Sequence, residues 1–136
     1  MKNIFTAFLL ILAATLHLNS CGKAEDIITP THYSRVPRAV NLSISYDTTS
    51  TGKYRVMINW TAETTNNLKD FEIYRSINKS NFFFLSGGIT TTKYIDSSNA
   101  GTVDSLNLAY FVNGRGIDRF IGQSSDTIKI LVTKPF

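Results

Sequence analysis

From Val40 onward, apolar and polar side chains alternate in short runs, and this period of two is the feature that most restricts the fold. Successive side chains of a strand point to opposite faces of a sheet, so such alternation predicts strands with one buried face. Turn-forming residues rich in Asp, Ser, Thr and Gly separate the runs. The clearest alternating runs are Val40–Tyr46, Tyr54–Trp60, Leu106–Val112 and Ile128–Val132.

Three shorter apolar segments, Phe71–Arg75, Phe82–Leu85 and Thr91–Ile95, bring the number of expected strands to seven. None of the segments has a helical period. A sheet with one apolar face needs a second sheet to cover that face. The sequence therefore predicts an all-β domain over residues 37–136, a seven-stranded immunoglobulin-like sandwich with Trp60 between its sheets.

The order of several motifs resembles that of fibronectin type III domains. Pro37 opens the domain and Trp60 closes the second strand, as in that family. The match continues through Phe71–Ser76, Tyr94–Asp96, Tyr110–Gly114 and Gly122–Ser125. The resemblance implies a sandwich of fibronectin type III type that serves as a binding or adhesion module. Two positions depart from the family: Leu108 replaces a frequent aromatic residue, so the usual tyrosine corner is expected to be absent or moved, and Gly114 replaces a frequent Ala.

The N-terminal segment has the features of an export signal. Lys2 supplies a positive charge, and Ile4–Leu18 is an apolar run of fifteen residues that three polar side chains interrupt. A helix that crosses a bilayer needs about 20 apolar residues. The run is shorter than that and favours the apolar region of a secretory signal.

Leu18-Asn19-Ser20-Cys21 ends this run and resembles the lipobox of bacterial lipoproteins. Cys21 is the single cysteine of the chain. The resemblance implies a signal peptide over residues 1–20, cleavage before Cys21, a diacylglyceryl group on its sulfur and an acyl chain on its new amine. Two or more acyl chains hold a protein firmly to a membrane. The alternative is a secreted protein with a stray cysteine, which is less favoured because a free thiol is a liability in an oxidising compartment.

Residues 21–36 contain Pro30 and few apolar side chains, which predicts a flexible tether between the lipid and the domain. Within the tether, Lys23–Asp26 resembles the acidic export signals of Bacteroidota surface lipoproteins. A solvated charged linker is the alternative explanation. The expected location is the bacterial cell envelope, at the outer membrane, on either its periplasmic or its external side.

The sequence offers little for catalysis. His32 is the one histidine after Cys21, and it lies in the tether, so the usual histidine-based triads are not expected. The acidic residues occur one or two per loop, and Asp96 and Asp104 are expected to be solvated turn residues rather than a pair. The basic residues are scattered, which gives nucleic-acid binding little support at a net charge of +4. We expect no enzymatic activity, no cofactor and no metal.

Two groups of residues are candidates for binding. The first is the run Phe82–Phe84 with Tyr74, because alternation makes at least one Phe of the run point away from the core. The second is Asn113–Ser125, expected to be a polar loop or a hairpin extended around Phe120. Packing under a loop and an ordinary mobile hairpin are the respective alternatives. The candidate binding residues are Tyr74, Phe82, Phe84, Arg115, Arg119 and Phe120.

Two functions agree with these features. One is a lipid-anchored envelope protein that displays a single binding or adhesion module, with the membrane as a partner through Cys21 and an unknown protein or glycan as ligand. The other is an accessory subunit of an envelope complex, for polysaccharide capture or secretion, that acts through protein–protein contacts.

Overall fold

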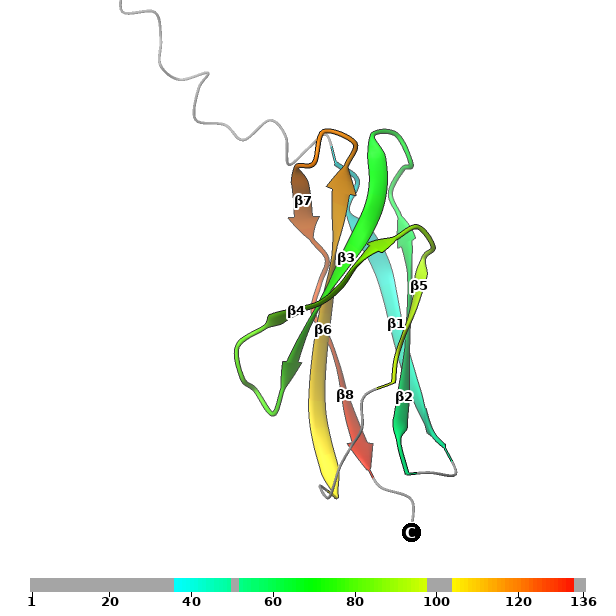
Figure 1. The fold of residues 1–136 in the computed structure, drawn as a ribbon, viewed down its shortest axis with the longest axis vertical. Helices are drawn as coiled ribbons and strands as arrows, with labels where there is room; N and C mark the ends of the chain where they lie inside the picture. The colour runs from blue at the N-terminus through cyan, green and yellow to red at the C-terminus, as the bar shows by residue number, and fades with distance from the viewer. Residues whose placement is uncertain (1–35, 50–51, 98–103, 134–136) are drawn as a thin grey trace, which may run out of the picture. The chain divides into compact units, whose positions relative to one another are not determined.

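The computed structural model describes residues 36–49, 52–97 and 104–133, and these ranges form two antiparallel β-sheets that pack face to face (Figure 1). No helix suited to crossing a bilayer occurs within them. The two packed sheets confirm the expected all-β sandwich. Its strands are β1 (Ala39–Thr48), β2 (Tyr54–Ala62), β3 (Leu68–Ile77), β4 (Phe83–Ile89), β5 (Lys93–Asp96), β6 (Ser105–Gly116), β7 (Ile121–Ser124) and β8 (Ile128–Thr133).

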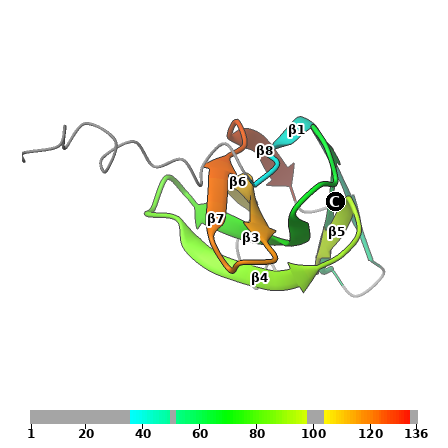
Figure 2. The ribbon, with the colours of Figure 1, turned by 90° about the horizontal axis from the view of Figure 1, so that it is seen from above.

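The smaller sheet has the order β1-β2-β5, and the larger sheet has the order β4-β3-β6 with β7 and β8 beyond β6 (Figure 2). Both β7 and β8 pair with the same strand, through Arg115↔Ile121 and Tyr110↔Ile128. They therefore occupy one edge of the sheet in two pieces. Eight strands are present in the described ranges instead of the expected seven, because this edge is interrupted.

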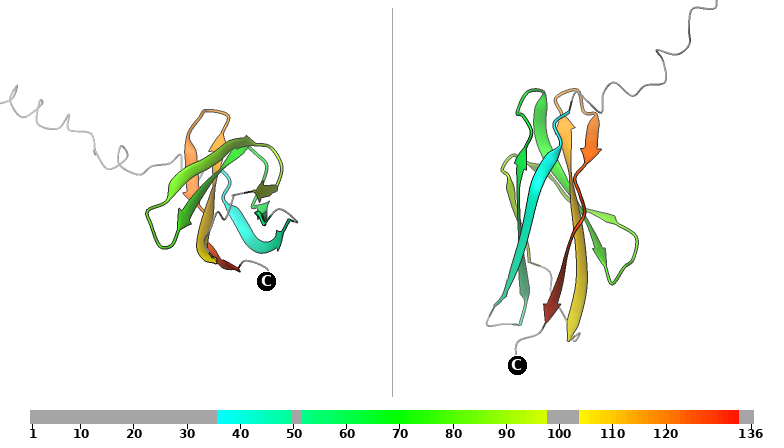
Figure 3. Two further views of the ribbon diagram at one scale, coloured as in Figure 1. Left: turned by 60° about the horizontal axis from the view of Figure 1, so that its bottom comes forward. Right: turned by 180° about the vertical axis from the view of Figure 1, so that it is seen from behind.

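Ser125 causes the interruption. The Val112 amide donates a 2.9 Å hydrogen bond to the Ser125 hydroxyl, and the Ser125 amide donates one of 2.9 Å to the Val112 carbonyl. The side chain thus takes the place of a backbone acceptor and redirects the chain between β7 and β8. β8 also runs alongside β1 of the smaller sheet. There the Tyr46 and Thr133 hydroxyls are 3.1 Å apart (Figure 3).

The segment Asn113–Ser125, expected to be a polar loop or a hairpin, is a hairpin. β6 continues to Gly116, and only residues 117–120 form the turn before β7. Close contacts explain why this hairpin contains glycines. A Cβ at Gly114 would collide with the carbonyl oxygen of Pro37, and one at Gly122 would lie 2.9 Å from the carbonyl oxygen of Val36. The backbone leading into β1 crosses this end of the sheet, which explains why Gly114 replaces the Ala frequent in fibronectin type III domains.

The core consists of the inward side chains of the two sheets. Trp60 is 3% exposed and meets Phe71 of the other sheet edge to face, with ring centroids 5.3 Å apart. This confirms the expected position of Trp60 between the sheets. Leu108 is also buried in this core. Further core members are Val56, Ile58, Ile73, Tyr110, Val112 and Val132.

One polar cluster lies within this apolar interior. Asp96, at the end of β5, accepts on Oδ2 a 2.6 Å hydrogen bond from Arg75 and a 2.8 Å hydrogen bond from the Tyr110 hydroxyl. Burial and the neighbouring Asp96 carboxylate raise the pKa of Tyr110 well above its usual value. The expectation that Asp96 is a solvated turn residue is therefore wrong, because Arg75 and Tyr110 draw it into the core. Asp104 is exposed, as expected.

The lipobox, Cys21 and most of the tether lie outside the described residues. The structure therefore leaves the signal peptide and the lipid anchor as predictions.

Candidate functional site

The outward face of the larger sheet carries a group of stacked aromatic rings. Tyr74 of β3 and Phe111 of β6 are cross-strand neighbours, and their rings stack with centroids 4.8 Å apart and planes 8° apart. Both side chains point outward because their strand neighbours, such as Ile73 and Val112, point into the core.

Two phenylalanines from the β4 side extend this stack. Phe84 meets Tyr74 edge to face at 5.7 Å, and Phe82 meets Phe111 at 4.9 Å. Phe84 is 56% exposed and Phe82 is 40% exposed, so the prediction that part of the Phe run points away from the core is confirmed. Phe83 lies instead over the guanidinium of Arg75, 5.1 Å from the ring centroid to Cζ. We call Tyr74, Phe82, Phe84 and Phe111 the aromatic cluster.

A charged network borders the aromatic cluster on the same face. Arg115 donates two hydrogen bonds, of 2.7 and 2.6 Å, to the carboxylate of Asp70, and its Nη1 lies 3.5 Å from Glu72. The Tyr74 hydroxyl donates a 3.1 Å hydrogen bond to Glu72. The bonds to Asp70 raise the pKa of Arg115, and burial together with Glu72 raises the pKa of Tyr74. Arg115 thus orders this end of the face through its two acidic neighbours.

The remaining sequence candidates lie apart from the sheet face, in the turn between β6 and β7. Arg119 has a positive φ of 71°, and the Phe120 amide donates a 3.2 Å hydrogen bond to Asp118. Phe120 is 50% exposed. The structure therefore brings Tyr74, Phe82 and Phe84 together, places Arg115 beside them, and puts Arg119 and Phe120 at the tip of a hairpin.

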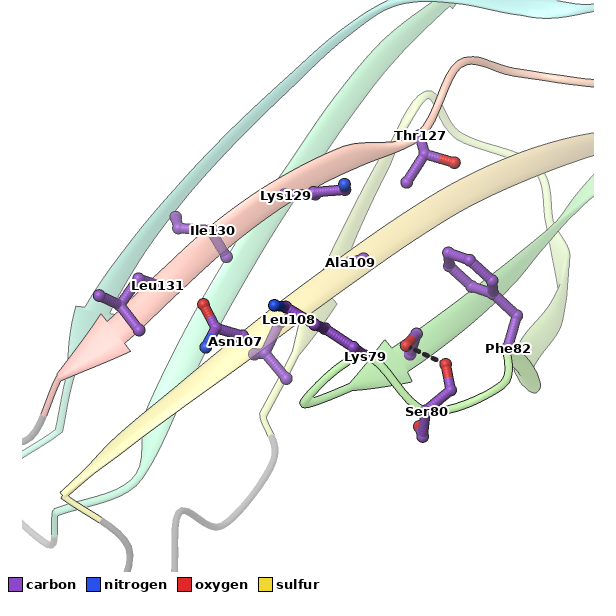
Figure 4. Close-up of a pocket in the computed structure, with 11 residues that line it drawn as sticks. Lys79, Ser80, Phe82, Asn107, Leu108, Ala109, Thr127, Lys129, Ile130 and Leu131 are labelled. Carbon is purple, nitrogen blue, oxygen red and sulfur yellow. Dashed lines mark hydrogen bonds between the residues drawn. The ribbon is translucent and has the colours of Figure 1, made fainter.

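A groove of about 470 Å³ adjoins the aromatic cluster (Figure 4). Its floor includes Ser76 and Ala109, whose small side chains are cross-strand neighbours in the row next to Tyr74 and Phe111. Phe82 belongs both to the aromatic cluster and to the groove. The other lining residues are Lys79 and Ser80 from the β3–β4 turn, Asn107 and Leu108 from β6, and Thr127, Lys129, Ile130 and Leu131 along β8.

Sequence reasoning missed Phe111, Lys79, Lys129 and Asn107. Alternation alone places Phe111 outward, because it lies between the buried Tyr110 and Val112. The groove itself leaves no comparable signal, since it depends on the pairing of strands that are distant in the sequence. No group of three or more potential metal-ligating side chains occurs in the part of the chain that the structure describes.

Comparisons with known proteins agree on architecture alone. No family model matches the chain, and no curated protein matches it in sequence. Among solved structures, a protein described as a myokine aligns with a TM-score of 0.53 and 14% identity, over 73% of this chain and 97% of that one. A β-1,2-glucanase from Parabacteroides distasonis aligns with a TM-score of 0.50 and 18% identity, over 74% of this chain and 14% of that one. An Fn3-like protein from Clostridium thermocellum aligns with a TM-score of 0.48 and 18% identity, over 69% of this chain and 88% of that one. Together with the strand order, the two likenesses with TM-scores of 0.50 and above identify the fold as a two-sheet β-sandwich.

Proposed function

We propose that this chain is a non-catalytic binding module of the bacterial cell envelope, displayed on a lipid-anchored tether. The observation that carries the binding role is the aromatic cluster on the solvent side of the larger sheet. Its rings hold one another in place, so they present a large apolar surface that loses little conformational freedom on binding. Exposed apolar patches of this kind commonly mark interaction sites.

The anchor is supported by the sequence. The lipobox resemblance at Leu18–Cys21 implies a lipid on Cys21, and the residues that follow the cysteine are suited to a tether. The same features support a location at the outer membrane.

The anchor is tested by partition of the expressed full chain between detergent and aqueous phases. We expect the wild type in the detergent phase and Cys21→Ala in the aqueous phase, because the mutant lacks the sulfur that accepts the lipid. Ser20→Ala is the matched control, since it keeps a small residue before the cysteine and should still partition with detergent. Partition of Cys21→Ala into detergent would show that the protein has another form of anchorage.

The binding face is tested by affinity purification of the lipidated protein from detergent extracts. Phe84→Ser alters the aromatic cluster, while Ile95→Ser alters a comparably exposed side chain on the smaller sheet. We expect Phe84→Ser to lose the bound material and Ile95→Ser to retain it. Equal retention by both variants would exclude the aromatic cluster as the binding surface. Recovery of a stoichiometric protein would identify the chain as an accessory subunit of an envelope complex.

A further inference from the structure

We propose that the groove beside the aromatic cluster binds an acidic oligosaccharide, with Lys79 and Lys129 contacting uronate carboxylates and Phe82 contacting the C–H face of a sugar ring. This inference rests on the proposed binding function and names the ligand class for one site. Figure 4 shows Lys79 and Phe82 extending from the β3–β4 turn and Lys129 projecting from β8.

The centre of the groove offers side chains and no free backbone ladder. Ala109 at its centre pairs with Ser76 on one side and with Lys129 on the other, so its strand is hydrogen-bonded along both edges. An extended peptide binds a sheet mainly through unpaired backbone groups of an edge strand. The floor of this groove therefore favours a ligand recognised by side chains over a peptide added as a strand.

The charges around the groove favour an anion. No acidic residue lines it, and within the described ranges no carboxylate lies within ion-pair distance of Lys79 or Lys129. By contrast, Arg38, Arg55, Arg75 and Arg115 each pair with an Asp. The two lysines are thus cations available to a ligand. Exposed ion pairs are weak alone, so binding also requires contacts with the groove surface.

The neutral lining suits a carbohydrate. The backbone amide of Asn107 donates to Asn78, but its side-chain amide and the Thr127 hydroxyl form no hydrogen bond with another described residue, so both can bond to sugar hydroxyls. The Ser76 hydroxyl, in contrast, is already used by its bond to the Ser80 carbonyl. Phe82 and Leu131 add apolar surface at opposite sides of the small Ala109. A volume of about 470 Å³ lies within the usual range of ligand sites.

The test compares three probes by titration calorimetry on the mature chain purified in detergent. The probes are a β-1,4-linked tetraglucuronate, the neutral cellotetraose of the same linkage, and tetraglutamate. We expect tetraglucuronate to bind most tightly, and its affinity to fall as salt is added. Equal binding of cellotetraose would overturn the role of the lysines, and equal binding of tetraglutamate would overturn the carbohydrate assignment.

Variants then locate the site. We expect Lys129→Ala and Lys79→Ala each to weaken tetraglucuronate binding by about ten-fold, the loss typical of one charged hydrogen bond. Lys93→Ala, on the smaller sheet, changes the net charge equally and should leave the affinity unchanged. Equal weakening by Lys93→Ala would show diffuse charge attraction and overturn the site. Absence of tetraglucuronate binding would overturn this inference alone, because retention of a partner through Phe84 would still support the proposed function.

Discussion

The hydroxyl of Tyr110 donates a 2.8 Å hydrogen bond to Oδ2 of Asp96, and this bond joins the two sheets of the sandwich. Arg75 donates to the same oxygen at 2.6 Å. Asp96 is 5% exposed, so one carboxylate oxygen accepts hydrogen bonds from two polar side chains that burial has largely removed from water. An ionic contact in this setting depends on all of its members, because removal of one leaves a buried charge.

We expect Asp96→Asn to destabilise the domain by about 3 kcal/mol, because it removes the negative charge that faces the guanidinium of Arg75. The side chain of Arg75 is only 12% exposed, so water replaces that charge poorly. Urea denaturation measures the effect. Asp47→Asn is the control, since it breaks a solvent-exposed pair with Arg55 and should change the midpoint little. Similar losses in both variants would contradict this account.

The Tyr110 hydroxyl predicts an alkaline limit to stability. Its folded-state pKa is raised, chiefly by burial and then by Asp96, whereas the unfolded chain releases this proton near pH 10. The unfolded state therefore binds fewer protons above about pH 10, and stability should fall by up to about 1.4 kcal/mol per pH unit for this group. Tyr110→Phe should give a shallower fall above pH 10, measured by urea denaturation at stepped pH. An unchanged slope would contradict the prediction. Tyr74, whose pKa is also raised, accounts for a residual slope.

Trp60 is expected to contribute a large part of the stability. Its side chain is 3% exposed and packs on Phe71 across the sandwich, so Trp60→Ala should cost about 3–5 kcal/mol through lost burial and the cavity that remains. The denaturation midpoint reports the loss. Ile117→Ala removes a side chain that is 69% exposed and should leave the midpoint nearly unchanged. An unaltered midpoint for Trp60→Ala would be incompatible with a core position.

Gly114→Ala should destabilise the domain by about 1–3 kcal/mol, because the added methyl group forces Pro37 and its backbone away from β6. Thermal unfolding measures the effect. Gly52→Ala provides a comparison of a different kind, since Gly52 has a φ of +72° with open space around it and should cost only backbone strain, about 1 kcal/mol. A Gly114→Ala protein as stable as the wild type would mean that the chain leading into β1 moves aside freely.

The strands were predictable because their signal is local. In the runs around Val56 and Leu108, each apolar residue is followed by a polar or outward one, and burial follows that pattern. β6 extends four residues beyond the expected Val112, into the segment that the sequence left open between a loop and a hairpin. Its Gly114 and Gly116 resemble turn residues, yet they lie in a strand that the backbone near Val36 crosses closely.

Contacts between distant residues were less accessible to sequence reasoning. Asp is a common turn residue, so the sequence favours turns at Asp96 and Asp70. Their hydrogen-bond partners, Arg75 and Arg115, lie 21 and 45 positions away in the sequence. Alternation predicted an outward Phe next to Tyr74. It could not predict the groove, because that depends on two small side chains, Ser76 and Ala109, meeting in one cross-strand row.

The break at Ser125 also governs how one copy of this domain can meet another. Fibril growth and domain exchange begin when a foreign strand docks on a long, straight and unpaired border. Beyond β6 that border consists of a four-residue piece and a six-residue piece, offset by a buried serine. A docking strand would lose its hydrogen bonds at the offset, so crowded copies are protected from polymerising along this side.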